Sequence, residues 1–121
     1  MDVIELLGMK FLGTHGCLEK EQTSPQPFGV DLRLYLSTRE AGKADDLRLT
    51  VNYAQAYEIV RRHIEGSVKK LIEALAEAIA QDLLQTFSRL HGVEVTVHKP
   101  QAPIAGLFDD VRVRIYRRQK A

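Results

Sequence analysis

Two charged side chains, Glu73 and Lys99, stand where the hydrophobic pattern of the chain leaves little room for polarity. Glu73 lies within the apolar run 71–76, and a helical period places it at the border of an apolar stripe. A carboxylate at that border is either a surface residue whose stem packs while its head reaches water, or an anchor at the rim of a pocket. The sequence leaves these two interpretations of Glu73 equally open.

Lys99 ends a short run in which valines alternate with polar residues. With this period of two, Lys99 falls on the same face as Val93, Val95 and Val97, so it leaves the strand on the core side. It is therefore either a lysine that snorkels to water from a strand end or a partly desolvated amine suited to acid–base chemistry.

The histidines and the single cysteine give no spacing typical of a metal site. The four histidines are His15, His63, His91 and His98. Because a catalytic zinc takes three protein ligands, usually His, Cys or carboxylate, we expect no metal. Cys17 cannot form an internal disulfide and is either a nucleophile or a small, partly buried loop residue. We favour the loop residue because no acid that would orient a nucleophile is identifiable.

The apolar periods predict the order strand, strand, helix, helix, strand, strand. The predicted strands are 3–11, with a bulge or a close backbone contact at Gly8, and 28–37, 93–99 and 111–116. The predicted helices are 53–65 and 67–87. A long loop over 12–27 and a polar connection over 38–50 separate the first elements. The second strand is the clearest, because apolar residues alternate strictly along it: Phe28, Val30, Leu32, Leu34 and Leu36.

Helix boundaries follow from capping residues. Asn52 with Gln55 three residues later resembles a capping box, so a helix should start near Tyr53. Gly66 should end it, and Ser67 should cap the second helix, whose apolar residues follow the spacing of an amphipathic helix.

Two consecutive helices between two pairs of strands predict an α+β fold of order ββααββ. We expect a four-stranded, largely antiparallel sheet with both helices on one face. The opposite face is too polar for a dry core, so it is either solvated or lines the interior of an oligomer. Its residues would be Asp31, Arg33, Tyr35, Glu94, Thr96, His98, Arg112 and Arg114.

Length and composition fit one domain spanning residues 1–121, with 45% hydrophobic and 27% charged residues. Seventeen basic and 16 acidic residues give a net charge of +1, so we expect no nucleic-acid or membrane partner. No apolar run is long enough to cross a bilayer. The first five residues lack the basic start and apolar run of a signal peptide, so we expect a cytoplasmic protein.

Short segments along nearly the whole chain resemble the dihydroneopterin aldolase family of the folate pathway. Each segment alone is weak, but their joint order and spacing are specific. They are Gly13-Thr14-His15-Gly16 with Glu21 downstream, Gln26-Pro27-Phe28, Asp45-Asp46, Thr50-Val51-Asn52-Tyr53, Leu71-Ile72-Glu73-Ala74-Leu75-Ala76, Val97-His98-Lys99-Pro100 and Ala102-Pro103-Ile104-Ala105-Gly106.

The resemblance implies the tunnelling fold, in which ββααββ subunits form ring tetramers that can stack as octamers. The polar sheet face would then line a central barrel, with the helices outside. The pterin pocket would lie between neighbouring subunits of this homo-oligomer.

The resemblance also implies roles for single residues at the substrate. Glu73 matches the carboxylate that anchors the pterin ring by accepting two parallel N–H bonds. Ile72, Val51 and Asn52 are expected beside the substrate.

Three residues match catalytic positions of the family: Lys99, Tyr53 and Glu21. The side that carries Tyr53 would come from the adjacent subunit. His15 and Gly16 are expected to shape the site without reacting.

The implied reaction is a retro-aldol cleavage of 7,8-dihydroneopterin, without metal or cofactor, to 6-hydroxymethyl-7,8-dihydropterin and glycolaldehyde. The C6=N5 imine of the substrate takes up the electrons that other aldolases pass to a Schiff base or a metal. The protein then needs a base for the 2′-hydroxyl, a donor near N5 and fixed geometry.

Two other functions remain open. The first is epimerisation at C2′ of dihydroneopterin or its triphosphate, and Lys20, as the only basic residue close to Glu21, favours the unphosphorylated substrate. The second is a non-catalytic module that binds RNA or protein through the polar sheet face. Only Tyr35 and Tyr116 could stack bases there, and the charge is balanced, which disfavours RNA.

Overall fold

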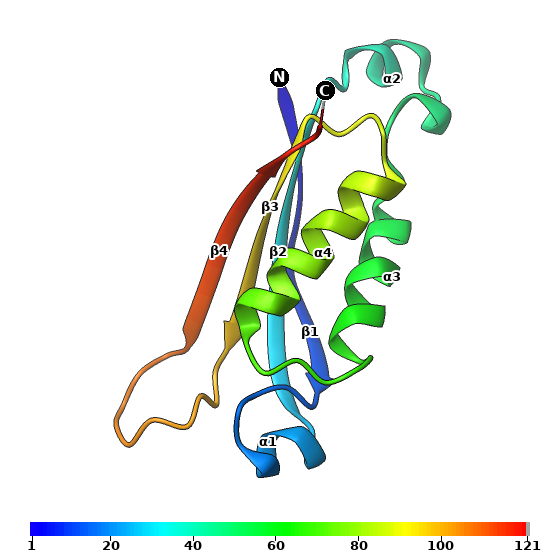
Figure 1. Ribbon diagram of the computed structural model, residues 1–121. Helices are drawn as coiled ribbons and strands as arrows, with labels where there is room; N and C mark the ends of the chain where they lie inside the picture. Colours follow the sequence, from blue (N-terminus) through cyan, green and yellow to red (C-terminus); the bar gives the residue numbers. More distant parts are fainter. Residues whose placement is uncertain (121) are drawn as a thin grey trace.

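The structure, a computed structural model, describes residues 1–120. Four antiparallel strands form one sheet, in the order in which they occur in the chain, and the main helices cover one face of it (Figure 1). The strands are β1 (Asp2–Gly13), β2 (Gln26–Leu36), β3 (Gly92–Lys99) and β4 (Val111–Arg118). The predicted α+β arrangement is confirmed.

A bulge interrupts β1 where the sequence predicts it, at Gly8. Leu6 pairs with Leu32 and Met9 pairs with Val30, so two residues of β1 lie opposite one residue of β2. Gly8 has a φ of 73°, in the left-handed region that glycine adopts without strain.

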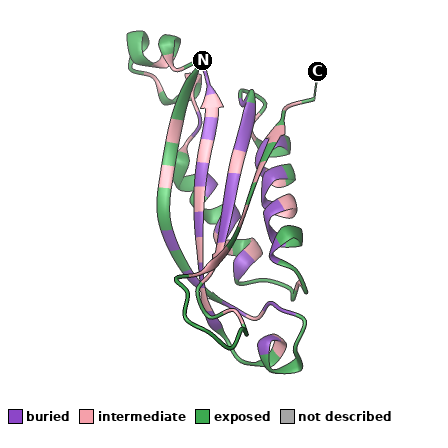
Figure 2. Ribbon diagram, turned by 90° about the vertical axis from the view of Figure 1, so that its left-hand side faces the viewer, coloured by how far each residue is buried: buried purple, intermediate pink, exposed green. Residues whose placement is uncertain are grey.

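The core lies between the sheet and two helices, α3 (Tyr53–Ile64) and α4 (Ile72–Thr86). Burial alternates along β2, most of β3 is buried, and the helices bury the stripe that faces the sheet (Figure 2). Helix α3 begins where the sequence predicts, because Asn52 Oδ1 accepts the N–H of Ala54 at 2.9 Å.

The start of the second helix is predicted at Ser67, and this prediction is wrong, since α4 begins at Ile72. The N–H of Gly16 donates to the carbonyl of Lys69 at 3.0 Å, and the N–H of Lys69 donates to His15 Nδ1 at 3.0 Å. These contacts occupy backbone groups that helical turns between Ser67 and Leu71 would need.

The segments predicted as loops contain three short helical elements. The first is α1 (Glu19–Thr23), and the connection after β2 holds α2 (Arg39–Ala44) and the 3₁₀ turn η1 (Leu47–Leu49). Among residues 1–120, no helix has both the length and the apolar content needed to cross a membrane.

Candidate active site

At one end of the sheet, the last residue of β3 meets the short helix α1. Lys99 Nζ lies 2.7 Å from Glu21 Oε2, and the two side chains are 11% and 8% exposed. The core-side orientation predicted for Lys99 is therefore confirmed, and its partner is a buried carboxylate. A buried ion pair contributes little net stability, because the cost of desolvating both charges offsets their attraction. The presence of this pair therefore indicates a chemical role for Lys99 and Glu21.

Two further donors hold the Glu21 carboxylate. Gln26 Nε2 donates to Oε2 at 3.2 Å, and the N–H of Leu18 donates to Oε1 at 3.4 Å. Burial opposes the negative charge, but the hydrogen bonds from Lys99 and Gln26 outweigh it and hold the pKa of Glu21 below its usual value. Glu21 is therefore ionised at neutral pH and lies 2.7 Å from the amine of Lys99.

His15 is buried at this end of the molecule, with 1% of its surface exposed, and its ring bonds to two backbone groups. Its Nε2–H donates to the carbonyl of Ile64 at 2.6 Å, and its Nδ1 accepts the N–H of Lys69. One nitrogen donates and the other accepts, so the ring is neutral; burial is the main reason that the pKa of His15 is lowered. These bonds support the shaping role implied for His15.

Gly16 leaves space for the Glu21 carboxylate. Its φ of 148° is one that other residues rarely adopt, and a Cβ at this position would collide with Glu21 Oε1. Any side chain at position 16 would therefore displace the carboxylate that pairs with Lys99.

Glu73 stands in the first turn of α4, at the same end of the sheet as α1 (Figure 1). Its side chain is exposed, whereas Ile72 beside it is buried, so Glu73 does occupy a boundary position. The helix N-terminus favours a negative charge there. The carboxylate is thus available to a ligand at this end of the molecule.

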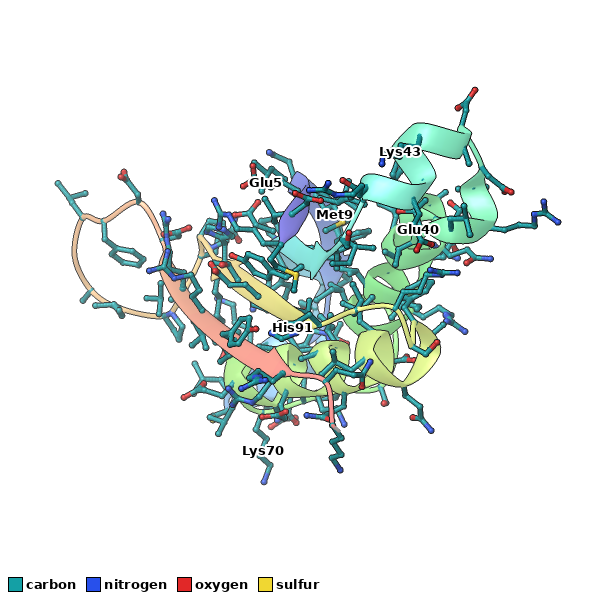
Figure 3. The ribbon with its side chains drawn as sticks, turned by 90° about the horizontal axis from the view of Figure 1, so that it is seen from above. Glu5, Met9, Glu40, Lys43, Lys70 and His91 are labelled. Atoms are coloured by element: carbon teal, nitrogen blue, oxygen red, sulfur yellow. The ribbon has the colours of Figure 1, made fainter. Side chains whose placement is uncertain are left out.

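Two lysines also reach this end through the segment before α4. The carbonyl of Lys69 accepts the N–H of Gly16, and the carbonyl of Lys70 lies 3.5 Å from Cys17 Sγ. The Lys70 side chain extends outward from the body (Figure 3). Lys69 and Lys70 therefore lie beside the loop that carries Gly16 and Cys17. The preference for an unphosphorylated substrate, which rested on Lys20 alone, stays a prediction.

Tyr53, Asn52 and Val51 lie at the other end of the helix pair. Val51 lines the same hollow as Phe87, which follows the last turn of α4, whereas Glu73 stands in its first turn. At 1.5 Å per residue, roughly 20 Å of helix separates the two ends. Tyr53 is 62% exposed. One chain alone therefore does not bring Tyr53 to Lys99, Glu21 and Glu73.

Two further sequence predictions concern metal binding and Cys17. Within residues 1–120, no group of three or more His, Cys, Asp or Glu side chains is arranged to hold a metal ion. Cys17, predicted to be partly buried, is exposed, so that prediction is wrong. The turn at Gly16 buries the Glu21 side of the loop and leaves Cys17 on the outside.

Sequence reasoning missed Gln26. Its Nε2 donates both to Glu21 Oε2 and to the carbonyl of His15, the latter at 3.4 Å. The signal was present, because Gln26 shares the period of Phe28 and Val30 and is a polar residue in phase with the core. A polar side chain at such a position needs buried partners.

The structure thus combines an α+β fold, in which two helices cover one face of a four-stranded sheet, with a buried ammonium–carboxylate pair at one end. The family model described as "FolB: Dihydroneopterin aldolase" matches residues 4–116, and the chain belongs to the dihydroneopterin aldolase family. It is therefore an aldolase of folate biosynthesis.

The similarity to individual relatives extends over almost the whole length of both chains. A dihydroneopterin aldolase of Bacillus subtilis is 40% identical over 119 residues, which cover 98% of this chain and 99% of the relative. One from Streptomyces coelicolor is 47% identical over 117 residues, covering 97% and 98%. The crystal structure of E. coli dihydroneopterin aldolase in complex with neopterin has a TM-score of 0.88 at 32% identity, covering 97% of this chain and 99% of that chain.

Proposed function

We propose that two copies of the chain build each active site of this aldolase. One copy supplies Lys99, Glu21, Glu73 and Ile72, and its neighbour supplies Tyr53, Val51 and Asn52. The observation that carries the proposal is the separation of these two groups by roughly the length of α4, about 20 Å. Residues that serve one small substrate from such distant places must come from different chains.

The sheet offers the means of assembly. β1 and β4 each have one neighbouring strand, so each leaves a free edge that can pair with another copy. On the polar face, Arg33 Nε lies 2.7 Å from Glu5 and Arg33 NH1 lies 3.2 Å from Glu94. These ion pairs suit a wet interior better than a dry core. We infer a ring tetramer around this face, with the octamer as its stacked form.

In the proposed reaction, the Lys99–Glu21 pair takes the proton of the 2′-hydroxyl, directly or through a water. The C1′–C2′ bond then breaks, and C2′ leaves with C3′ as glycolaldehyde. The electron pair stays on C1′ and spreads into C6=N5, where N5 gains a proton. Tyr53 delivers a proton to C1′, and N5 releases its own, which gives 6-hydroxymethyl-7,8-dihydropterin. No step requires a metal or a cofactor.

Glu73→Ala should weaken pterin binding by about 1.5–3 kcal/mol, the usual contribution of hydrogen bonds to a charged group. This loss corresponds to a Kd roughly 10- to 150-fold higher, measured by calorimetric titration with neopterin. The fold should persist, because the side chain is exposed in the free chain. Glu40→Ala, an exposed glutamate on α2 (Figure 3), is the control and should bind as the unmodified protein does. An unchanged Kd in folded Glu73→Ala protein would reduce Glu73 to a boundary residue.

Tyr53→Phe should separate the two outcomes of the proposed reaction. The variant keeps the ring but loses the hydroxyl, so formation of the hydroxymethyl product should fall by about 10²-fold or more. Cleavage and re-addition to the other face of glycolaldehyde remain possible, so the C2′ epimer should become the larger fraction of product. Chromatography of reactions with 7,8-dihydroneopterin gives this ratio.

Tyr57→Phe is the matched control, one turn further along α3. Tyr57 packs on Phe11 with ring centroids 5.3 Å apart, and its hydroxyl has no role in the proposed site. Equal loss of both products in Tyr53→Phe would contradict the assigned role. Epimer as the main product of the unmodified protein would favour the epimerase alternative.

A further inference from the structure

His98 lies on the polar face of the sheet, one residue before Lys99, and both of its ring nitrogens face carboxylates. Nε2 is 2.7 Å from Asp31 Oδ2 on β2, and Nδ1 is 2.6 Å from Asp110 Oδ2 just before β4. The three side chains, which we name the His98 clamp, are 17%, 25% and 12% exposed in the order His98, Asp31, Asp110. Each ring nitrogen faces a carboxylate oxygen at hydrogen-bond distance, and a ring that carries a hydrogen on both nitrogens donates to both aspartates.

Both carboxylates of the clamp are held by further donors. Asp31 Oδ1 accepts the N–H of Gly8 at 2.7 Å, so the bulge of β1 supplies a donor to the clamp. Arg112 NH2 donates to Asp110 Oδ1 at 2.9 Å. Burial opposes both negative charges. Hydrogen bonds from Gly8 and His98 to Asp31, and from His98 and Arg112 to Asp110, outweigh it and lower both pKa values.

The clamp fixes the backbone at Lys99. Successive residues of a strand point to opposite faces, so His98 and Lys99 share one stretch of backbone while their side chains serve different faces. Lys99 pairs with Val111 across the β3–β4 ladder, and Asp110 immediately precedes Val111. The bond between His98 and Asp110 thus closes the base of the 100–110 loop at the position of Lys99.

The same loop borders the active-site end. Gln101 and Pro103 line a hollow together with Glu21 and Gln26. A loop that moved at its base would therefore shift both the amine of Lys99 and the wall beside its carboxylate partner.

We propose that the His98 clamp positions Lys99. This proposal rests on the proposed function, in which Lys99 takes part in proton transfer. A misplacement of about 1 Å at a reacting group can reduce a rate by up to about 10²-fold.

The other charged groups near the clamp are Lys10 on β1, Arg33 on β2 and Arg112 on β4. None of them meets the ring nitrogens, which contact only the two carboxylates among residues 1–120.

The test compares Asp110→Asn with Asp109→Asn, a neighbouring exposed aspartate. In the unmodified protein, ¹⁵N NMR at pH 7 should show hydrogens on both ring nitrogens of His98. Asp110→Asn should lose this signature and lower kcat for 7,8-dihydroneopterin by about tenfold, with KM changed less than about twofold. Asp109→Asn should change neither, and His98→Gln serves if Asp110→Asn does not fold.

Three results would overturn the positioning role. They are a neutral His98 ring in the unmodified protein, normal kcat in a variant that has lost the signature, and a loss of folded protein that accounts for the whole loss of rate. The proposed function is tested apart from this, by Lys99→Ala. If that variant is inactive while Asp110→Asn is fully active, the catalytic assignment stands and the clamp proposal fails.

Discussion

Replacing Lys99 with alanine should reduce aldolase turnover by about 10²–10⁴-fold, the usual contribution of a general acid–base group. Cleavage and C2′ epimerisation should fall together, because both begin with removal of the same proton from the 2′-hydroxyl. KM should change little, since Glu73 holds the ring in the proposed site. Steady-state kinetics with 7,8-dihydroneopterin, with both products resolved by chromatography, measures these effects.

Lys99→Ala also leaves the Glu21 carboxylate without the cation that lies 2.7 Å from it. Removing one partner of a buried pair lowers stability, so the Tm of the variant should fall. Adding Glu21→Gln should restore part of the Tm without restoring turnover, which separates the chemical effect from the structural one. Lys43→Ala, an exposed lysine on α2 (Figure 3), should keep both properties. Near-normal cleavage by folded Lys99→Ala protein would contradict its catalytic role.

The elements of this fold that are predictable from sequence are those whose signals are local. The alternation along β2 predicts its core face, and every second residue from Phe28 to Leu36 is buried. The Asn52 cap predicts the first residue of α3, and Gly8 predicts the bulge of β1. Each of these features depends on neighbours within a few residues, which a period or a cap can show.

The wrong predictions concern segments shaped by residues far along the chain. Ser67 is a good helix cap by type, but the segment after it is held by His15 and Gly16 of the first loop. Cys17 is exposed because Gly16 turns the chain so that Glu21 faces inward. The bonds that hold both segments join the first loop to residues 64–70, which lie far along the chain, so no local pattern could show these outcomes.

In the candidate site, too, local patterns predict the orientation of single residues but not which distant residues they contact. The period of β3 predicts that Lys99 faces the core, but only the fold shows that Glu21 is its partner. Gln26 is in phase with the core, so its position predicts a buried polar side chain that needs a hydrogen-bond partner, but the pattern does not show that this partner is Glu21. The distance of Tyr53 from the pair could not be predicted, because it depends on the length and direction of α4.

The second prediction with a large effect concerns that distance. Lys99→Ala and Tyr53→Phe proteins, each reduced by about 10²-fold or more in aldolase turnover, should regain activity when dissociated, mixed and reassembled. A site that joins an intact Lys99 from one chain to an intact Tyr53 from its neighbour forms in about one quarter of random pairings. The mixture should therefore recover up to about a quarter of normal turnover.

A mixture of Lys99→Ala with Glu73→Ala is the decisive control. The proposed site takes both residues from the same chain, so no pairing in this mixture has both intact. At a substrate concentration far below the Kd of Glu73→Ala, turnover should not exceed the average of the two parents. Native mass spectrometry should confirm hybrid oligomers in both mixtures. Failure of the first mixture, with hybrids present, would place Tyr53 and Lys99 in sites built from one chain. Recovery in the second would assign Glu73 to the neighbouring subunit, because residues on the same chain cannot complement each other across an interface that repeats by symmetry.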